Sequence, residues 1–231
     1  MIKLENLRTY GWMSAIHGMR NPMNSWEKSD SYETHGEYGD QFFFGENDLA
    51  LAKKLTQAGP DHRKFLRQIF VSMDITAPLY WWKEYDTYKV GTVANSCSTM
   101  HKIHAKDFVR EDFSHEHLDE WGLANLDRTI RALNIDREMF VNYDEKTGLK
   151  LPRAHYWYQM IQLLPSSYNQ LRTVTLNYEN LLNMYRARKD HKLDEWHTFC
   201  DTVADLPYFR EIIGAADEQQ MEEWERKENR S

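Results

Sequence analysis

Apolar residues recur at every second position of residues 69–75, and this period of two predicts a strand with one apolar face. Pro78 ends the strand and suits the first turn of a following helix, because a proline there loses no helical hydrogen bond. That helix is expected from Leu79 to about Tyr85. A second alternating stretch, residues 171–176, predicts another strand, and Asn177 after it is a plausible N-cap for a helix to about Ala187.

Elsewhere the apolar spacing favours helices. These are expected around residues 13–19, from 46 to the Gly-Pro step at 59–60, over 61–67, from 118 (Leu118, Trp121, Leu126, Ile130 and Leu133), over 157–164, and over 193–203. Residues 91–99 are interpreted as a polar loop and residues 144–148 as a turn.

These elements indicate an α+β fold with a mixed antiparallel sheet and several packed helices. We expect a single domain over residues 1–214 and a charged C-terminal tail over 215–231. Within the domain, residues 1–45 show no sustained period and are interpreted as loops around one short helix.

Composition narrows the function. The 231 residues carry a formal net charge of −7, which argues against general nucleic-acid binding. Two cysteines, Cys97 and Cys200, cannot build a disulfide framework and favour a reducing compartment. No stretch approaches the roughly 20 apolar residues that span a bilayer. A cytoplasmic protein without membrane contact is therefore expected.

The segment around Pro78 resembles the signature region of the flavin-dependent thymidylate synthases (ThyX). That region has a strand, an Ala-Pro step, an aromatic helix with Arg-Gln, then Arg-His-Arg and a polar loop. Here Lys83-Glu84 stands at Arg-Gln, Thr87-Tyr88-Lys89 stands at Arg-His-Arg, and residues 95–100 stand at the end of the loop.

A second match lies further along the chain. Leu164-Pro165, a strand, and then Asn177, Leu181, Asn183 and Arg188 are similar to the Leu-Pro, strand and Asn-x-Arg-x-Leu-x-Asn helix of that family. Together with a histidine near the flavin, matched by His62, the resemblance covers residues 61–214.

The resemblance implies a thymidylate-synthase-complementing-protein-like fold and a homotetramer that binds FAD and a pyrimidine nucleotide such as dUMP. NADPH and a folate one-carbon donor would complete a methyltransferase reaction. It assigns cofactor binding to His62, Tyr88, Lys89, Asn177 and Asn183, and substrate binding to Glu84, Ser98 and Arg188; no catalytic residue is assigned. Arg188 would grip the nucleotide phosphate, because a guanidinium binds phosphate through two charge-assisted hydrogen bonds.

Several positions depart from the family. Thr87 and Tyr88 carry no positive charge, and Glu179 replaces a cation. Arg172, Arg186 and Lys192 are possible substitutes as phosphate ligands. A changed pyrimidine substrate is one consequence. A catalytically inactive binding or assembly protein on the same fold, of phage or mobile-element origin, is the alternative.

Two other interpretations concern single features. Trp81-Trp82 could stack on a flavin, but an aromatic stripe on a helix is more often core. Cys97, His101 and His104, with His115 and His117 nearby, are acceptable zinc ligands. They lack the paired Cys-x-x-Cys or His-Glu-x-x-His spacing, so no metal is expected.

Overall fold

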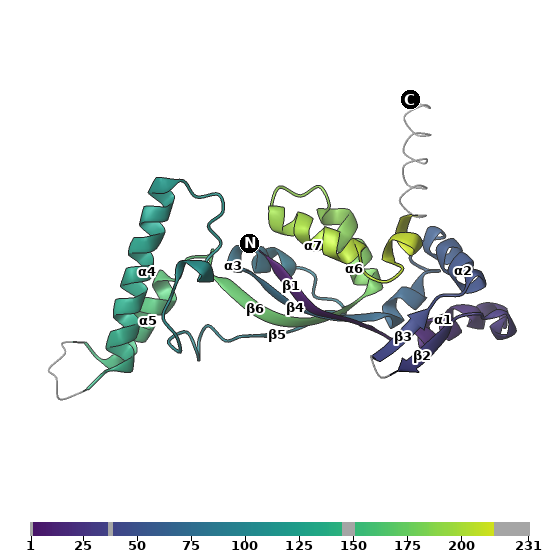
Figure 1. Cartoon of the computed structure of the whole chain (residues 1–231), viewed down its shortest axis with the longest axis horizontal. Coiled ribbons are helices and arrows are strands. Elements are labelled where there is room, and N and C mark those ends of the chain that lie inside the picture. Colours follow the sequence, from purple (N-terminus) through teal and green to yellow (C-terminus); the bar gives the residue numbers. More distant parts are fainter. Residues whose placement is uncertain (1, 37–38, 145–150, 215–231) are drawn as a thin grey trace, which may run out of the picture. The chain divides into compact units, whose positions relative to one another are not determined.

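The computed structural model describes residues 2–36, 39–144 and 151–214 (Figure 1). The strands are β1 Lys3–Tyr10, β2 Tyr32–Gly36, β3 Gly39–Phe43, β4 Phe70–Pro78, β5 Val93–Ser96 and β6 Asn169–Asn177. The α-helices are α1 Trp12–Arg20, α2 Glu46–Gln57, α3 Leu79–Tyr85, α4 Glu120–Val141, α5 Arg153–Leu163, α6 Tyr178–Arg188 and α7 Asp194–Ala204. Short 3-10 turns are η1 Asn21–Met23, η2 Trp26–Lys28, η3 Lys64–Gln68 and η4 Arg110–Asp112.

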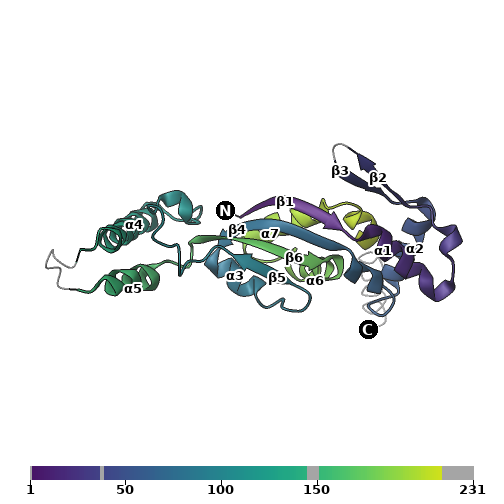
Figure 2. The ribbon, with the colours of Figure 1, turned by 90° about the horizontal axis from the view of Figure 1, so that it is seen from below.

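Four strands form one sheet in the order β1-β4-β6-β5, and β2 pairs with β3 as a separate antiparallel hairpin (Figure 2). Helices and an antiparallel sheet alternate irregularly along the chain, so the predicted α+β class is confirmed.

The pattern that predicted β4 also explains its burial. Ile69, Val71, Met73 and Ile75 are at most 1% exposed, whereas Phe70 between them is 45% exposed. The predicted bounds of α3 are confirmed, and β4 extends through Pro78 into its N-cap.

Contacts group the chain into two compact units. Unit 1 comprises residues 1–5, 74–88 and 94–173, and unit 2 comprises residues 6–73, 89–93 and 174–231. The boundary falls within all four strands of the larger sheet, β1, β4, β5 and β6, so both units take residues from the same strands. The single domain expected over residues 1–214 stays a prediction.

Some predictions were wrong. Residues 1–45 contain the strands β1, β2 and β3 in addition to the expected helix α1. The predicted loop 91–99 contains β5, and the helix expected over 61–67 is only the 3-10 turn η3. Most of the predicted turn at 144–148 and the charged tail lie outside the described residues.

In unit 1, α4 and α5 pack side by side (Figures 1 and 2). Their core consists of apolar residues from both helices and from the loop before them: Ile103, Phe108, Phe113, Leu126, Ile130, Leu133 and Met160. Leu118 and Trp121 were expected on the same face, but α4 begins only at Glu120 and these two side chains are 42% and 71% exposed.

The core of unit 2 is aromatic. The ring of Trp12 stacks on Phe42 at 4.8 Å between centroids and meets Tyr178 edge-on at 5.2 Å. None of the helices formed by described residues is both long and apolar enough to cross a bilayer.

A buried ion pair joins α1 to α2 in unit 2. Arg20 Nε donates to Asp48 Oδ1 at 2.5 Å, and the two side chains are 4% and 0% exposed. Burial by itself would raise the pKa of Asp48, but hydrogen bonds from Ser31, Arg20 and Ser29 outweigh it and lower that pKa.

Candidate functional site

The start of α6 is capped by Asn177. Its Oδ1 accepts the backbone N–H of Asn180 at 3.0 Å, and the backbone N–H of Asn177 donates to Asn180 Oδ1 at 3.3 Å. This reciprocal capping box satisfies N–H groups that the helix itself cannot. The prediction that Asn177 caps this helix is confirmed.

The loop before β5 lies against the same helix end. Asn180 Nδ2 donates to the carbonyl oxygen of Val90 at 2.7 Å. Gly91 has a φ of +73°, and a Cβ there would lie 3.0 Å from Asn180 Oδ1 and 3.2 Å from Asn177 Nδ2. Lys89, which is exposed, directly precedes Val90. Two predicted cofactor residues that are far apart in the sequence, Lys89 and Asn177, therefore lie in one region at the start of α6.

Sequence reasoning missed Asn180, which makes this connection. The signal was present, because a capping box places its second polar residue three positions after the N-cap. Asn180 occupies that position after Asn177.

The residue after His62, Arg63, contacts the same helix. His62 is exposed, whereas Arg63 is buried and donates three charge-assisted hydrogen bonds to Glu179, in the first turn of α6. Arg63 Nε lies 2.9 Å from Glu179 Oε2, and Nη2 lies 3.1 Å from Oε1. The reversal of sign seen at Glu179 is thus compensated within the fold.

The two remaining predicted residues of unit 2 lie further along α6. Asn183 is exposed and follows Asn180 by three positions, which places both on one side of the helix. Arg188 is the last residue of α6, and its guanidinium carbon lies 4.9 Å from the ring centre of Trp196. The 11 residues of α6 separate its two ends by about 16 Å.

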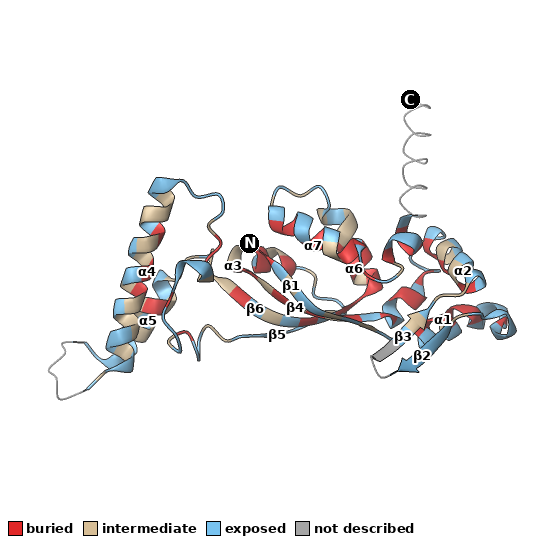
Figure 3. Cartoon of the chain, in the orientation of Figure 1, coloured by how far each residue is buried: buried red, intermediate tan, exposed pale blue. Residues whose placement is uncertain are grey.

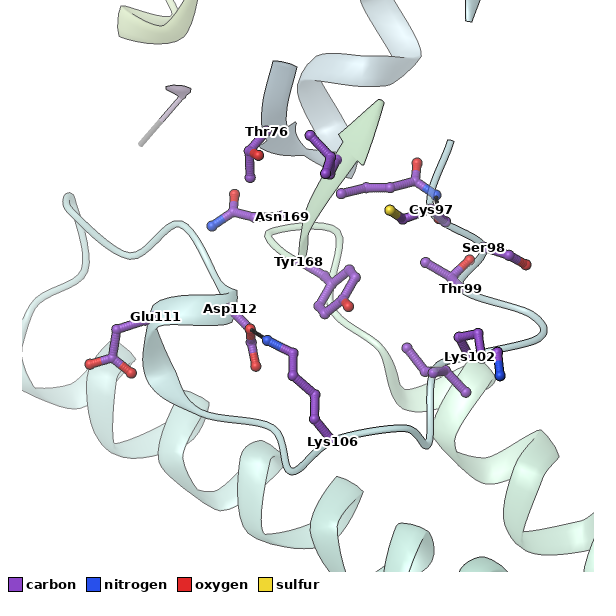
Figure 4. Close-up of a pocket in the computed structure, with 13 residues that line it drawn as sticks. Thr76, Cys97, Ser98, Thr99, Lys102, Lys106, Glu111, Asp112, Tyr168 and Asn169 are labelled. Atoms are coloured by element: carbon purple, nitrogen blue, oxygen red, sulfur yellow. Dashed lines mark hydrogen bonds and ion pairs between the residues drawn. The ribbon is translucent and has the colours of Figure 1, made fainter. Parts of the chain in front are cut away.

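Unit 1 contains a pocket of about 430 Å³ between the loop after β5, the turn before α4 and the start of β6 (Figure 4). Its wall includes hydroxyl, amide, thiol and ammonium groups from Ser98, Thr99, Asn169, Cys97, Lys102 and Lys106. The loop is fixed beside β6, because Cys97 N–H donates to the Leu171 carbonyl at 2.9 Å.

The pocket wall carries two ammonium groups, Lys102 and Lys106, and two carboxylates, Glu111 and Asp112, so its formal charges balance. Ser98 Oγ accepts the backbone N–H groups of Met100 at 3.2 Å and His101 at 3.0 Å, which holds the loop in a tight turn. Lys106 forms an ion pair with Asp112, and this bond raises the pKa of Lys106. Burial raises the pKa of Tyr168, whose ring lies between these groups in Figure 4.

Glu84 and Tyr88 are half-buried residues at the end of α3 and beyond it, in unit 1. The expectation that Trp81-Trp82 belongs to the core is confirmed, since the two side chains are 0% and 1% exposed.

Arg172 does not match its expected use as a phosphate ligand. Its guanidinium carbon lies 4.2 Å from the ring centre of Trp82, and Nη1 bonds to Asp86 Oδ1 at 2.8 Å. A cation engaged on both sides in this way stabilises α3 against β6 rather than offering a free fork.

The predicted residues thus fall into two groups. Glu84, Tyr88 and Ser98 belong to unit 1; His62, Lys89, Asn177, Asn183 and Arg188 belong to unit 2. A common site for Ser98 and Arg188 stays a prediction. In the described parts of the chain, no group of three His, Cys, Asp or Glu side chains is placed to hold a metal ion, so the zinc alternative gains no support.

Comparisons with known proteins find the fold but no sequence relative. No family model and no curated protein sequence matches the chain. Among solved structures, thymidylate synthase X (ThyX) of Helicobacter pylori with FAD and dUMP matches with a TM-score of 0.63 and 16% identity, over 94% of this chain and 99% of that chain. A second structure of the flavin-dependent thymidylate synthase ThyX from the same bacterium, complexed with FAD and dUMP, matches with a TM-score of 0.60 and 16% identity, over 91% and 95%.

The chain therefore has the fold of the flavin-dependent thymidylate synthases. At this identity the likeness establishes the fold alone. The match spans almost the whole length of the solved enzyme.

Proposed function

We propose that this protein binds FAD and a pyrimidine deoxynucleotide such as dUMP, and that it is a divergent relative of the flavin-dependent thymidylate synthases. The observation that carries the proposal is the fold shared along 94% of the chain with an enzyme whose structure holds both ligands. The order and spacing of the matched segments around Pro78 and Asn183 support it.

The residues around α6 fit a flavin nucleotide chemically. Lys89 supplies a cation, Asn177 and Asn183 supply amide groups, and Gly91 allows the loop to approach the helix end. When bound, the flavin would carry the redox chemistry, and this chain would bind and orient the substrates. In an active enzyme, NADPH and a folate would serve as reductant and one-carbon donor. By resemblance the protein is a cytoplasmic homotetramer.

Arg188 is the proposed phosphate ligand, and its replacement tests the nucleotide site. Replacing it by Ala removes one charge-assisted contact, which weakens dUMP binding about 10- to 100-fold in isothermal titration. Lys189→Ala removes the adjacent exposed cation and serves as the matched control. Equal dUMP affinity in both variants and the wild type would exclude Arg188 from the site.

The flavin is tested separately. Purified protein should show a bound yellow chromophore, or a melting temperature that rises with added FAD. If neither result is obtained, the chain has the fold of the flavin enzymes but does not bind the flavin, and the proposal fails.

A second candidate is a catalytically inactive binding protein on the same fold. It is favoured by the uncharged Thr87 and Tyr88 and by the engagement of Arg172 with Trp82 and Asp86. Protein that binds dUMP but forms no dTMP with FAD, NADPH and methylenetetrahydrofolate present would support this candidate.

A further inference from the structure

The turn between α6 and α7 brings a tryptophan against the end of α6. The two helices pack on each other in unit 2, and both carry buried residues (red in Figure 3). Trp196, in the first turn of α7, is 0% exposed. The guanidinium carbon of Arg188, the last residue of α6, lies 4.9 Å from the centre of its ring. The contact is therefore that of a cation over a buried aromatic face.

A series of hydrogen bonds fixes this turn. The backbone N–H of His191 donates to the carbonyl oxygen of Arg188 at 3.0 Å, and the N–H of Leu193 donates to His191 Nδ1 at 3.2 Å. The N–H of Trp196 then donates to the carbonyl oxygen of Leu193 at 3.0 Å. These bonds lead from one partner of the stack to the other, so the turn itself holds the indole against the guanidinium.

The indole is also held by other rings. The ring of Phe199 meets it edge-on at 5.4 Å between centroids, and the ring of His191 meets it edge-on at 6.3 Å. Phe199 is itself 0% exposed. Because the indole is packed in this way, its face is a fixed surface. A guanidinium stacked on that surface loses much of the rotational freedom that an arginine side chain has in water.

Stacking uses the face of a guanidinium, whereas its N–H donors point outwards in the plane of the group. Arg172 demonstrates within this chain that the two uses are compatible. Its guanidinium carbon lies 4.2 Å from the ring centre of Trp82, and its Nη1 donates to Asp86 Oδ1 at 2.8 Å. Carboxylate and phosphate oxygens are bound by the same edge of the group. An arginine stacked on a tryptophan therefore keeps the geometry that binds an anion.

We infer that Trp196 is a positioning residue for nucleotide binding, which holds the guanidinium of Arg188 in one plane so that its edge is set for the phosphate. The inference rests on the proposed function, in which Arg188 is the phosphate ligand. It adds that the affinity for the nucleotide depends on an aromatic face that acts through Arg188 rather than on the ligand. Ordering the arginine before binding removes an entropic cost that a freely rotating side chain would carry.

Replacement of the indole tests this role. Trp196→Leu keeps an apolar side chain but removes the aromatic face, and it should weaken dUMP binding about 3- to 10-fold in isothermal titration. Trp196→Phe keeps a smaller aromatic face and should bind dUMP only about two- to threefold more weakly than the wild type. Val203→Ala removes buried volume elsewhere in α7 and is the matched control, with unchanged dUMP affinity.

A double-variant cycle separates positioning from a general loosening of the fold. Because Trp196 acts through Arg188, Trp196→Leu should cause no further loss of dUMP affinity when Arg188 is already replaced by alanine. A purely structural role would weaken binding by the same factor on both backgrounds. Trp196→Phe is carried through the same cycle, so the comparison is still made if the leucine variant does not fold.

The outcomes distinguish this inference from the proposed function. Losses of dUMP affinity that occur only when Arg188 is present support the positioning role. If the wild type binds dUMP but the losses in the Trp196 variants are absent, or are equal on both backgrounds, the positioning role alone is overturned. A Val203→Ala loss as large as that of Trp196→Leu has the same consequence. Wild-type protein that does not bind dUMP refutes both the proposed function and this inference.

Discussion

The buried ion pair of Arg63 and Glu179 provides a test of how the fold compensates the negative charge of Glu179. The two side chains are 7% and 9% exposed and share three charge-assisted hydrogen bonds. Removing either partner leaves the other charge buried without compensation, which costs about 3–5 kcal/mol of unfolding free energy. Arg63→Met and Glu179→Leu are the two perturbations.

Removing both partners together should cost much less than the sum. Well-packed apolar replacements of a buried ion pair are often neutral, so the double variant should recover at least about 2 kcal/mol relative to additivity. With a urea dependence of about 3 kcal/mol per molar, each single variant lowers the unfolding midpoint by about 1 M or more.

Tryptophan fluorescence is a suitable probe, since the chain contains eight tryptophans. Circular dichroism should report the same midpoint if unfolding is two-state. The exposed pair of Arg210 and Asp205 has the same 2.9 Å separation at 65% and 74% exposure, so Arg210→Met is the matched control and should leave the midpoint unchanged. Single-variant losses below about 1 kcal/mol, or strictly additive losses, would refute the compensation argument.

Three further results are expected. The pKa of Asp48 is lowered in the folded protein, so its carboxylate stabilises the fold at pH values above the ordinary pKa of about 3.9. This stabilisation is lost as the pH falls through the lower pKa of the folded state. Asp48→Asn should therefore cost about 3 kcal/mol of unfolding free energy at pH 7 and flatten the acid limb of a curve of stability against pH. Gly91→Ala should lower the melting temperature and weaken FAD in a titration, because the new Cβ meets Asn180 at 3.0 Å and a φ of +73° disfavours alanine; unchanged values for both would contradict the close approach. At pH 8, a thiol reagent should modify exposed Cys97 and spare Cys200 until unfolding, since burial raises the pKa of Cys200 to about 12, and Cys97→Ser should remove the fast phase.

The sequence predicted the elements whose periods are strong. The alternation in β4, the aromatic helix α3 and the cap of α6 carry local signals, and the structure confirms them. Strand β1 has no such signal: its burial pattern shows no fully buried position, and its pairing with β4 depends on a distant segment. β5 is short and exposed, so its sequence is similar to that of a loop.

For the candidate site, the sequence supplied the residue types but not their partners. Glu179 is negative at a position where the resembled family has a cation. From the sequence alone, this difference removes a cation from the candidate site. The structure places Arg63 beside it, from a segment 116 positions away. Such a pairing has no local pattern, because it depends on how η3 packs against α6.

Arg63 and Arg172 are both engaged in structural contacts, which limits their use as ligands for an anion. Arg63 neutralises Glu179, and Arg172 is held between Trp82 and Asp86, so both cations stabilise the fold. Unit 2 also carries Lys89, beside the loop that meets the start of α6, and Arg188 at the end of α6, where its guanidinium lies over the ring of Trp196. The helix between these two positions is about 16 Å long, so a ligand that contacts both has to reach along it. A single phosphate is too small to span that distance, whereas a dinucleotide such as FAD, or a flavin and a nucleotide bound side by side, is long enough.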